Sequence, residues 1–189
     1  MKHIVIFASG SGSNTQRIVE HFSTSDIARV ILIFSNREDA YVLQRANQMN
    51  IPTVVFDRVD FYENDLIYNQ LDKLQPDLIV LAGFLWRVPE NIVHAFPQRI
   101  VNIHPALLPK YGGKGMYGIH VHRSVIENRE KESGITIHYV NEKYDEGAAI
   151  LQARCVINAN DTPESLAKKV HILEYTYFPK AIEQVLLRN

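Results

Sequence analysis

Apolar runs alternate with amphipathic segments along the first half of the chain. The runs predicted to be strands are residues 3–8, 28–35, 51–57, 76–84 and 99–104. The segments whose apolar positions recur at helical spacing are residues 15–22, 40–50, 60–75 and 88–96. Continuous apolar strands that alternate with helices are typical of a parallel sheet covered on both faces. We therefore predict an α/β fold with a doubly wound, Rossmann-like, mostly parallel sheet.

The second half of the chain has a different pattern. Residues 134–142 and 148–157 alternate apolar and polar positions, and the segment between them is too short for a helical crossover. This pair is predicted to be antiparallel, so the sheet gains antiparallel strands toward the C-terminal half. A closing helix is predicted to have Thr162 as its N-cap, Pro163 as its first helical residue and a kink at Pro179.

Composition narrows the class of protein. The chain has 189 residues and a formal net charge of −1, with no basic run that would indicate a nucleic acid or an anionic membrane as partner. We expect one domain, residues 1–189. Cys155 is the only cysteine, which excludes an intrachain disulfide and a cysteine-based metal site. The first apolar run is too short for a membrane span and leads directly into a turn, so we expect a cytoplasmic protein without a signal peptide.

A polar pair stands at the end of the fifth predicted strand, in the sequence VNIHPALLP. Because side chains alternate along a strand, Asn102 and His104 point to the same face and Ile103 to the other. Open α/β sheets bind ligands at the carboxyl ends of their strands. An amide donor beside an imidazole suits a developing oxyanion. A mutually satisfied polar pair in a strand-end turn is the alternative, and this segment by itself favours that alternative.

A glycine-rich turn, ASGSGSNT, joins the first strand to the first helix. Glycines let the backbone approach an anion, and a helix N-terminus offers free N–H groups. The third glycine of the dinucleotide fingerprint is absent, because Thr15 occupies its place. The turn therefore favours a phosphate monoester as ligand, and a tight turn without a ligand is the alternative.

Two further groups have weaker patterns. Asp145 lies in the turn between the last two strands, where it could reach His104 and raise the pKa of that imidazole, or serve only the turn. His120 and His122 diverge on a helix, so we expect no metal site. His138 lies within a strand pattern, and we expect it to be structural.

In combination these segments resemble a known family. FASGSGSN, LAGF, NIHPALLPKY and GITIHYVNEKYDEGAAILQ occur in this order over essentially the whole chain. The sequence resembles the folate-dependent formyltransferases, and among them the phosphoribosylglycinamide formyltransferases of purine synthesis. The resemblance implies transfer of a formyl group from 10-formyltetrahydrofolate to the amine of glycinamide ribonucleotide, without a metal. It also implies small-molecule partners only, and leaves the oligomeric state open between a monomer and a weak homodimer.

The resemblance also implies roles for individual residues. The catalytic group it implies is Asn102, His104 and Asp145. The residues it implies for the ribonucleotide are Gly10, Ser11, Gly12, Ser13, Asn14 and Glu174. The residues it implies for the folate are Leu81, Gly83, Phe84, Leu85, Trp86, Arg87, Val88, Asn102, Tyr139, Val140 and Asp145.

The sequence departs from the family pattern in two places. Trp86 occupies the position where the family often has arginine, and Arg87 follows one place later. The loop at 111–118 is longer than its common counterpart and gives Lys114 and Tyr117 no assigned role. Two rival functions stay open at this point: a 10-formyltetrahydrofolate hydrolase, in which water replaces the amine, and a non-enzymatic α/β domain that binds a phosphate ligand.

Overall fold

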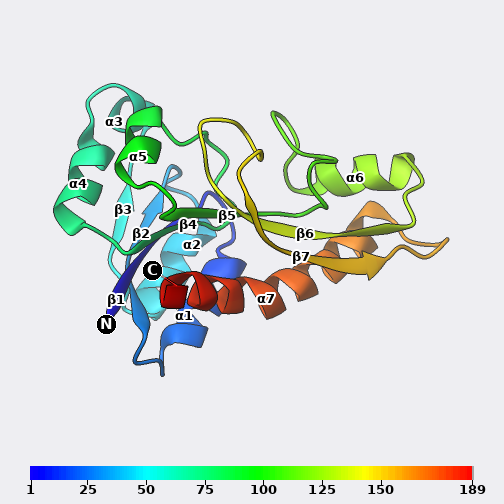
Figure 1. Ribbon diagram of the computed structural model, residues 1–189, viewed down its shortest axis with the longest axis horizontal. Helices are drawn as coiled ribbons and strands as arrows, with labels where there is room; N and C mark the ends of the chain where they lie inside the picture. Colours follow the sequence, from blue (N-terminus) through cyan, green and yellow to red (C-terminus); the bar gives the residue numbers. More distant parts are fainter. Residues whose placement is uncertain (189) are drawn as a thin grey trace. The chain divides into compact units, whose positions relative to one another are not determined.

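A computed structural model describes residues 1–188 and contains seven strands and seven helices in that range (Figure 1). The strands are β1 (Lys2–Phe7), β2 (Ala28–Ser35), β3 (Thr53–Val55), β4 (Leu78–Leu81), β5 (Ile100–His104), β6 (Glu132–Tyr139) and β7 (Ala149–Val156). The helices are α1 (Ser13–Phe22), α2 (Tyr41–Gln48), α3 (Arg58–Tyr62), α4 (Leu66–Leu74), α5 (Glu90–Ala95), α6 (Ile119–Glu127) and α7 (Pro163–Arg188).

The strands form one seven-stranded sheet in the order β3-β2-β1-β4-β5-β6-β7. β1 pairs in parallel with both β2 and β4, and β2 pairs in parallel with β3. β6 and β7 pair in antiparallel fashion, as their short connection requires. These pairings confirm the predicted α/β class, with a mostly parallel sheet and antiparallel strands toward the C-terminal side.

The described chain divides into two compact units. One comprises residues 1–101 together with the chain from Ile182 onward, and the other comprises residues 102–181. The prediction of a single domain over residues 1–189 stays a prediction.

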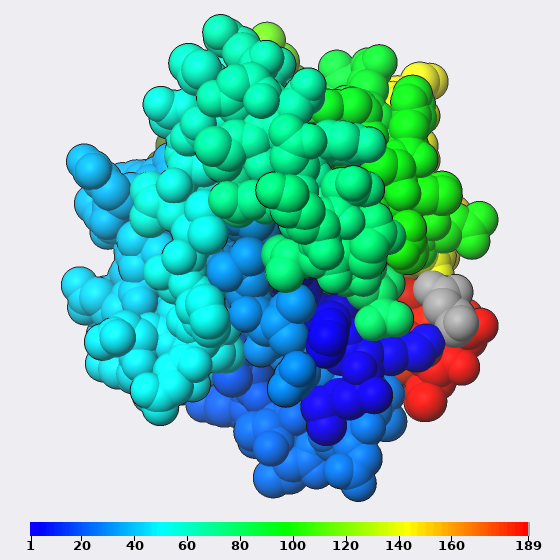
Figure 2. All heavy atoms as spheres, turned by 90° about the vertical axis from the view of Figure 1, so that its left-hand side faces the viewer, coloured from blue at the N-terminus to red at the C-terminus, as the bar shows by residue number. Residues whose placement is uncertain are grey.

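The first unit contains β1 to β4. Strands β1 and β4 are almost wholly buried, which explains their continuous apolar sequence. Helices α1 and α2 pack against β2, and α4 packs against α3 and α5. Figure 2 shows the face formed by α3, α4 and neighbouring segments in cyan and teal, with the first residues in dark blue beside the last turn of α7 in red. There, Lys2 Nζ donates to the carbonyl of Leu186 at 2.7 Å.

The second unit contains α6, the β6–β7 hairpin and most of α7. The middle of β6 is buried at every position, whereas β7 exposes alternate residues. α7 begins as predicted, because Ser165 N donates to Thr162 Oγ1 at 3.2 Å and Thr162 N donates to Ser165 Oγ at 3.0 Å. α7 continues through Pro179 as one helix.

Two predicted helices differ from the structure. The helix predicted over 60–75 is wrong, because α3 ends at Tyr62 and α4 begins at Leu66. Asp65 breaks the segment with a φ of +55°, a left-handed conformation that interrupts a helix. The first helix begins two residues earlier than predicted, at Ser13, directly after Gly12 in the left-handed region.

Candidate active site

Asn102 and His104 lie where the strand alternation predicts. Both belong to β5, and Ile103 between them is buried in the apolar core. The His104 side chain is only 5% exposed, so its polar atoms depend on protein partners. The structure confirms that Asn102 and His104 share one face at the end of the strand. A third polar side chain contacts both of them there.

Asp145 reaches this pair from the β6–β7 turn. Its backbone has a φ of +55°, which aspartate tolerates better than most residues. Gly147 allows the close turn, because a Cβ at that position would stand 1.7 Å from the carbonyl oxygen of Tyr139. The backbone N–H of Gly113 donates to Asp145 Oδ2 at 2.9 Å and fixes the carboxylate. Asp145 is therefore more than a turn residue.

The three side chains contact one another. Asp145 Oδ2 lies 3.5 Å from His104 Nδ1, and Asp145 Oδ1 accepts from Asn102 Nδ2 at 3.4 Å. Both distances exceed the usual length of a good hydrogen bond, so each contact can be exchanged for a shorter one. The structure thus gathers the predicted group of Asn102, His104 and Asp145 within one unit.

A second histidine joins the group. His138 is buried on β6, and its Nε2 lies 3.1 Å from Asn102 Nδ2 and 3.5 Å from Asp145 Oδ1. Its Nδ1 faces the carbonyl of Tyr139 at 2.9 Å, so Nδ1 carries the proton. In the tautomer with its proton on Nδ1, Nε2 can accept from the Asn102 amide. His138 fixes the orientation of Asn102, a role that its position in a strand pattern does not indicate.

The other nitrogen of His104 is held by the main chain. His104 Nε2 lies 2.7 Å from the carbonyl oxygen of Tyr111, which requires the proton on Nε2. Burial lowers the pKa of His104 below 6.5, against the opposing effects of the Asp145 carboxylate and the Tyr111 carbonyl. Asp145 does act to raise this pKa, as expected, but the expected net increase above 6.5 is wrong, because desolvation of the imidazolium exceeds the attraction of a carboxylate 3.5 Å away.

His122 is a further buried imidazole in the second unit. It lies on α6, its Nδ1 has no hydrogen-bond partner, and burial lowers its pKa to about 4, with smaller effects from His171 and His104. The described residues contain no group of three His, Cys, Asp or Glu side chains placed to hold a metal ion.

The glycine-rich turn lies in the first unit, between β1 and α1. Gly12 has a φ of +72°, and a Cβ there would stand 2.5 Å from Val42 Cγ2, so packing alone requires glycine. Gly10 is different, because a Cβ there would meet no atom within 4 Å. Arg45 of α2 donates from Nε to the carbonyl of Ser11 at 2.9 Å, which places a guanidinium beside the turn. The sequence pattern did not indicate this cation.

The folate residues predicted between Leu81 and Val88 also belong to the first unit. Ser9 holds this segment, because its Oγ accepts from Leu85 N at 3.0 Å and its N–H donates to Gly83 O at 3.1 Å. Trp86 packs against the rings of Phe56 and Phe61, with centroids 5.9 and 6.1 Å away.

Arg87 and Trp86 lie in the segment that departs from the family pattern. Arg87 pairs with a residue close to it in sequence, and a different arginine contacts Trp86. Arg87 donates to Glu90 at 2.9 Å. The Arg58 guanidinium lies 5.0 Å from the centroid of the Trp86 ring. Trp86 therefore belongs to an aromatic cluster of the first unit, in the slot where the family often has arginine.

The remaining predicted residues lie in the second unit. Glu174 is buried on α7, and Tyr139, the last residue of β6, and Val140 after it are half-buried. Tyr139 N donates to Ala148 O at 2.9 Å, which anchors the turn that carries Asp145. The first unit thus contains the glycine-rich turn and residues 81–88, and the second contains the predicted catalytic group with Glu174, Tyr139 and Val140.

The fold is an α/β fold with a mostly parallel sheet, and an amide, an imidazole and a carboxylate meet at the end of β5. The comparison with protein families gives the family: residues 2–182 match the formyl transferase family, and the chain belongs to it. The chain is an enzyme of this family, which implies a folate-type formyl donor.

Individual relatives agree with this membership. The chain is 37% identical to phosphoribosylglycinamide formyltransferase of Escherichia coli, over 95% of this chain and 85% of that protein. It is 41% identical to the chloroplastic phosphoribosylglycinamide formyltransferase of Arabidopsis thaliana, over 96% of this chain but only 64% of that protein. Glycinamide ribonucleotide transformylase 1 of Symbiobacterium toebii superposes with a TM-score of 0.89 at 33% identity, over 98% of this chain and 88% of that one.

Among the described residues, no helix combines the length and the apolar character needed to cross a bilayer.

Proposed function

We propose that this enzyme transfers the formyl group of 10-formyltetrahydrofolate to the primary amine of glycinamide ribonucleotide, a step of purine synthesis. The observation that carries the proposal is the contact group of Asn102, His104 and Asp145 in one unit of a formyl transferase. The names of the relatives support the ribonucleotide as acceptor.

Asn102 supplies the neutral donor to the formyl oxygen. One of its amide N–H groups already points to Asp145 across 3.4 Å, a weak contact that a substrate oxygen can replace. When the amine attacks, the formyl carbon becomes tetrahedral and its oxygen gains negative charge. A donor held in place by His138 stabilises that charge without reorganisation.

His104 supplies positive charge as the oxyanion forms. Its lowered pKa makes the neutral ring the resting form at neutral pH. Negative charge on the formyl oxygen raises the pKa of a neighbouring imidazole, so the ring takes up a proton during the reaction. Asp145 faces Nδ1 and stabilises the resulting imidazolium.

The proton balance closes without a covalent enzyme intermediate. The bond from the formyl carbon to the amine nitrogen forms, and the amine then loses one proton to the His104–Asp145 pair. The bond from the formyl carbon to N10 of the folate breaks, and N10 receives one proton. The donor leaves as tetrahydrofolate and the acceptor as the formamide.

The ribonucleotide phosphate is proposed to bind at the glycine-rich turn of the first unit. The residues proposed for it are Gly10, Ser11, Gly12, Ser13 and Asn14. The N-terminus of α1 follows this turn with no acid in its first turn, and Arg45 adds a cation beside Ser11. Glu174 is proposed for the ribose and glycinamide end, and residues 81–88 with Tyr139 and Val140 for the folate. We place the enzyme in the cytoplasm, with small molecules as its partners.

One assay tests this proposal against its two rivals. Purified protein is mixed with 10-formyltetrahydrofolate, with and without glycinamide ribonucleotide, and the folate absorbance is followed. Formyl transfer predicts donor consumption only with the amine present. Consumption without the amine would indicate the hydrolase, and no consumption in either mixture would indicate a phosphate-binding domain.

A further inference from the structure

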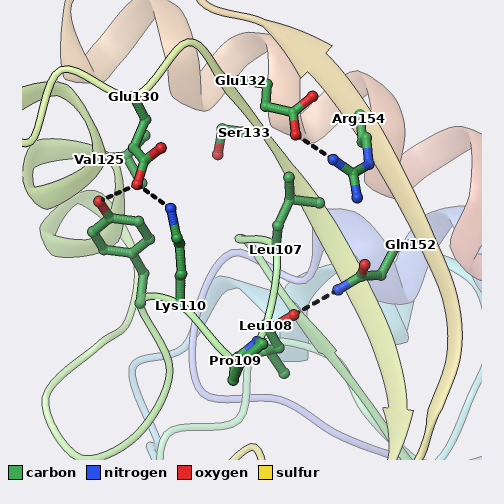
Figure 3. Close-up of a pocket in the computed structure, with 11 residues that line it drawn as sticks. Leu107, Leu108, Pro109, Lys110, Val125, Glu130, Glu132, Ser133, Gln152 and Arg154 are labelled. Carbon is green, nitrogen blue, oxygen red and sulfur yellow. Dashed lines mark hydrogen bonds and ion pairs between the residues drawn. The ribbon is translucent and has the colours of Figure 1, made fainter.

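The main-chain carbonyl that holds His104 belongs to a segment beside a cavity. The cavity has a volume of about 240 Å³, and Leu107, Leu108 and Pro109 line it together with Lys110 and Tyr111 (Figure 3). Because side chains do not fill this space, close packing fixes the segment less tightly than a solid core would. Polar contacts therefore have a larger share in positioning it.

Glu130 provides two of these polar contacts. Its Oε1 accepts from Lys110 Nζ at 2.8 Å and from Tyr111 Oη at 3.0 Å (Figure 3). The two donors come from consecutive residues, so a single carboxylate oxygen ties both to the chain just after α6. The Lys110 cation and the Tyr111 hydroxyl hold the pKa of Glu130 below its usual value, which keeps the acceptor ionised at neutral pH.

Tyr111 links this carboxylate to the active site. Its side chain donates to Glu130, while its carbonyl accepts from His104 Nε2 at 2.7 Å. Tyr111 also has a φ of +58°, an uncommon conformation for a residue other than glycine. Such a conformation persists where surrounding contacts hold it, and the contacts with Glu130 and His104 do so from the two ends of the residue.

We propose that Glu130 is a positioning residue, which acts through Tyr111 to hold the main-chain carbonyl against His104 Nε2. The carbonyl fixes the tautomer and the ring plane of His104, so that Nδ1 faces Asp145. Glu130 touches no reacting atom. This inference rests on the proposed function, because the positioned imidazole, His104, is the group that takes up a proton during formyl transfer.

The central test compares Glu130→Ala and Glu130→Gln with the wild type. Glu130→Ala is expected to lower kcat by about 10- to 100-fold, the usual consequence of a misplaced reacting group. The KM for the ribonucleotide should change little, because the substrate's own contacts stay intact. Glu130→Gln keeps an acceptor oxygen for Tyr111 and should recover part of the loss.

A second readout does not depend on turnover. The Tyr111 carbonyl raises the pKa of His104, so its displacement should lower that pKa further. NMR titration of the His104 ring is expected to give a lower pKa in Glu130→Ala than in the wild type, with Glu130→Gln between them. A role confined to folding would leave the pKa of His104 unchanged in the folded variant.

Glu132→Ala is the matched control. Glu132 lines the same cavity and pairs with Arg154 (Figure 3). The side-chain hydrogen bonds and ion pairs of Lys110 and Tyr111 go to Glu130 and not to Glu132. Both pairs are partly exposed and contribute little to stability, so both alanine variants should melt near the wild-type temperature. Glu132→Ala should keep the wild-type kcat and the wild-type pKa of His104.

The outcomes separate this inference from the proposed function. A wild-type enzyme that transfers formyl, with Glu130→Ala equal to it in kcat and in the pKa of His104, would overturn the inference and leave the function standing. Equal losses in the Glu130 and Glu132 variants would also overturn it. A wild-type enzyme without formyl transfer would remove the function itself, whatever the titration gives.

Discussion

Asp145 Oδ2 lies 3.5 Å from His104 Nδ1, and the carboxylate is itself fixed by the backbone N–H of Gly113. This relationship joins a turn residue to a strand residue 41 positions earlier in the sequence. The Asp145 carboxylate and the Tyr111 carbonyl thus face the two different nitrogens of the His104 ring.

The first prediction concerns the charge of Asp145. Asp145→Asn keeps the size and the turn conformation but removes the attraction that raises the pKa of His104. The pKa of His104, already below 6.5, should fall further, and turnover at neutral pH should fall by about 100- to 10,000-fold. NMR titration and steady-state kinetics measure the two effects. An unchanged pKa of His104 would show that the carboxylate does not act on the ring.

The second prediction concerns the side chain of His104. His104→Ala removes a group whose interaction strengthens only as the oxyanion forms, so kcat should fall by about 100- to 1,000-fold. The dissociation constant of the ribonucleotide, measured by calorimetry, should stay near the wild-type value. A variant with near-wild-type turnover would remove His104 from the mechanism.

The third prediction separates two glycines of the turn before α1. Gly10→Ala adds a methyl group where the protein leaves open space, so the fold should persist while an approaching phosphate is obstructed. Ribonucleotide binding should weaken by about tenfold or more, which corresponds to loss of one hydrogen bond to a charged group. Gly12→Ala instead meets Val42 and should lower the melting temperature. Calorimetry and thermal unfolding distinguish them, and unimpaired ribonucleotide binding by Gly10→Ala would place the phosphate elsewhere.

The fourth prediction concerns stability and pH. The pKa of His122 is about 4 in the folded chain and near 6.5 when unfolded. Above pH 6.5 the ring is neutral in both states and adds no pH dependence. As the pH falls from 6.5 to 4, His122 binds a proton in the unfolded chain but stays neutral in the folded chain. The free energy of unfolding therefore decreases by up to about 3 kcal/mol.

His122→Phe provides the control for this titration. Phenylalanine cannot bind a proton, so the variant should lose most of the decrease between pH 6.5 and 4, with the part due to His104 retained. Urea unfolding at several pH values measures the slope, and each protein is compared with its own value at pH 7. Equal slopes in the two proteins would assign the acid sensitivity to other groups.

The sequence predicts the parts of the fold that depend on local pattern. The buried strands and the antiparallel hairpin follow from apolar runs and from the length of one connection, and both are present. The boundary between α3 and α4 does not follow, because the apolar spacing continues across it while Asp65 adopts a left-handed backbone. A periodic pattern carries no information on such a local change of conformation.

The site was predictable to a similar extent. Strand alternation places Asn102 and His104 on one face, but the residues that orient them come from distant segments. His138 has the pattern of an ordinary strand residue, and Tyr111 contributes a main-chain carbonyl that any residue type would offer. The direction of the His104 pKa shift also depends on how deeply the fold buries the ring, which a sequence pattern does not contain.

The destination of the formyl carbon tests the central claim most directly. The protein is mixed with glycinamide ribonucleotide and with 10-formyltetrahydrofolate that carries ¹³C in the formyl group, and the label is followed by NMR. Formyl transfer by the Asn102, His104 and Asp145 group predicts that the label appears in a formamide attached to the ribonucleotide. The Asp145→Asn variant should form that product far more slowly. Label released as free formate, at a rate that the ribonucleotide does not change, would contradict the account.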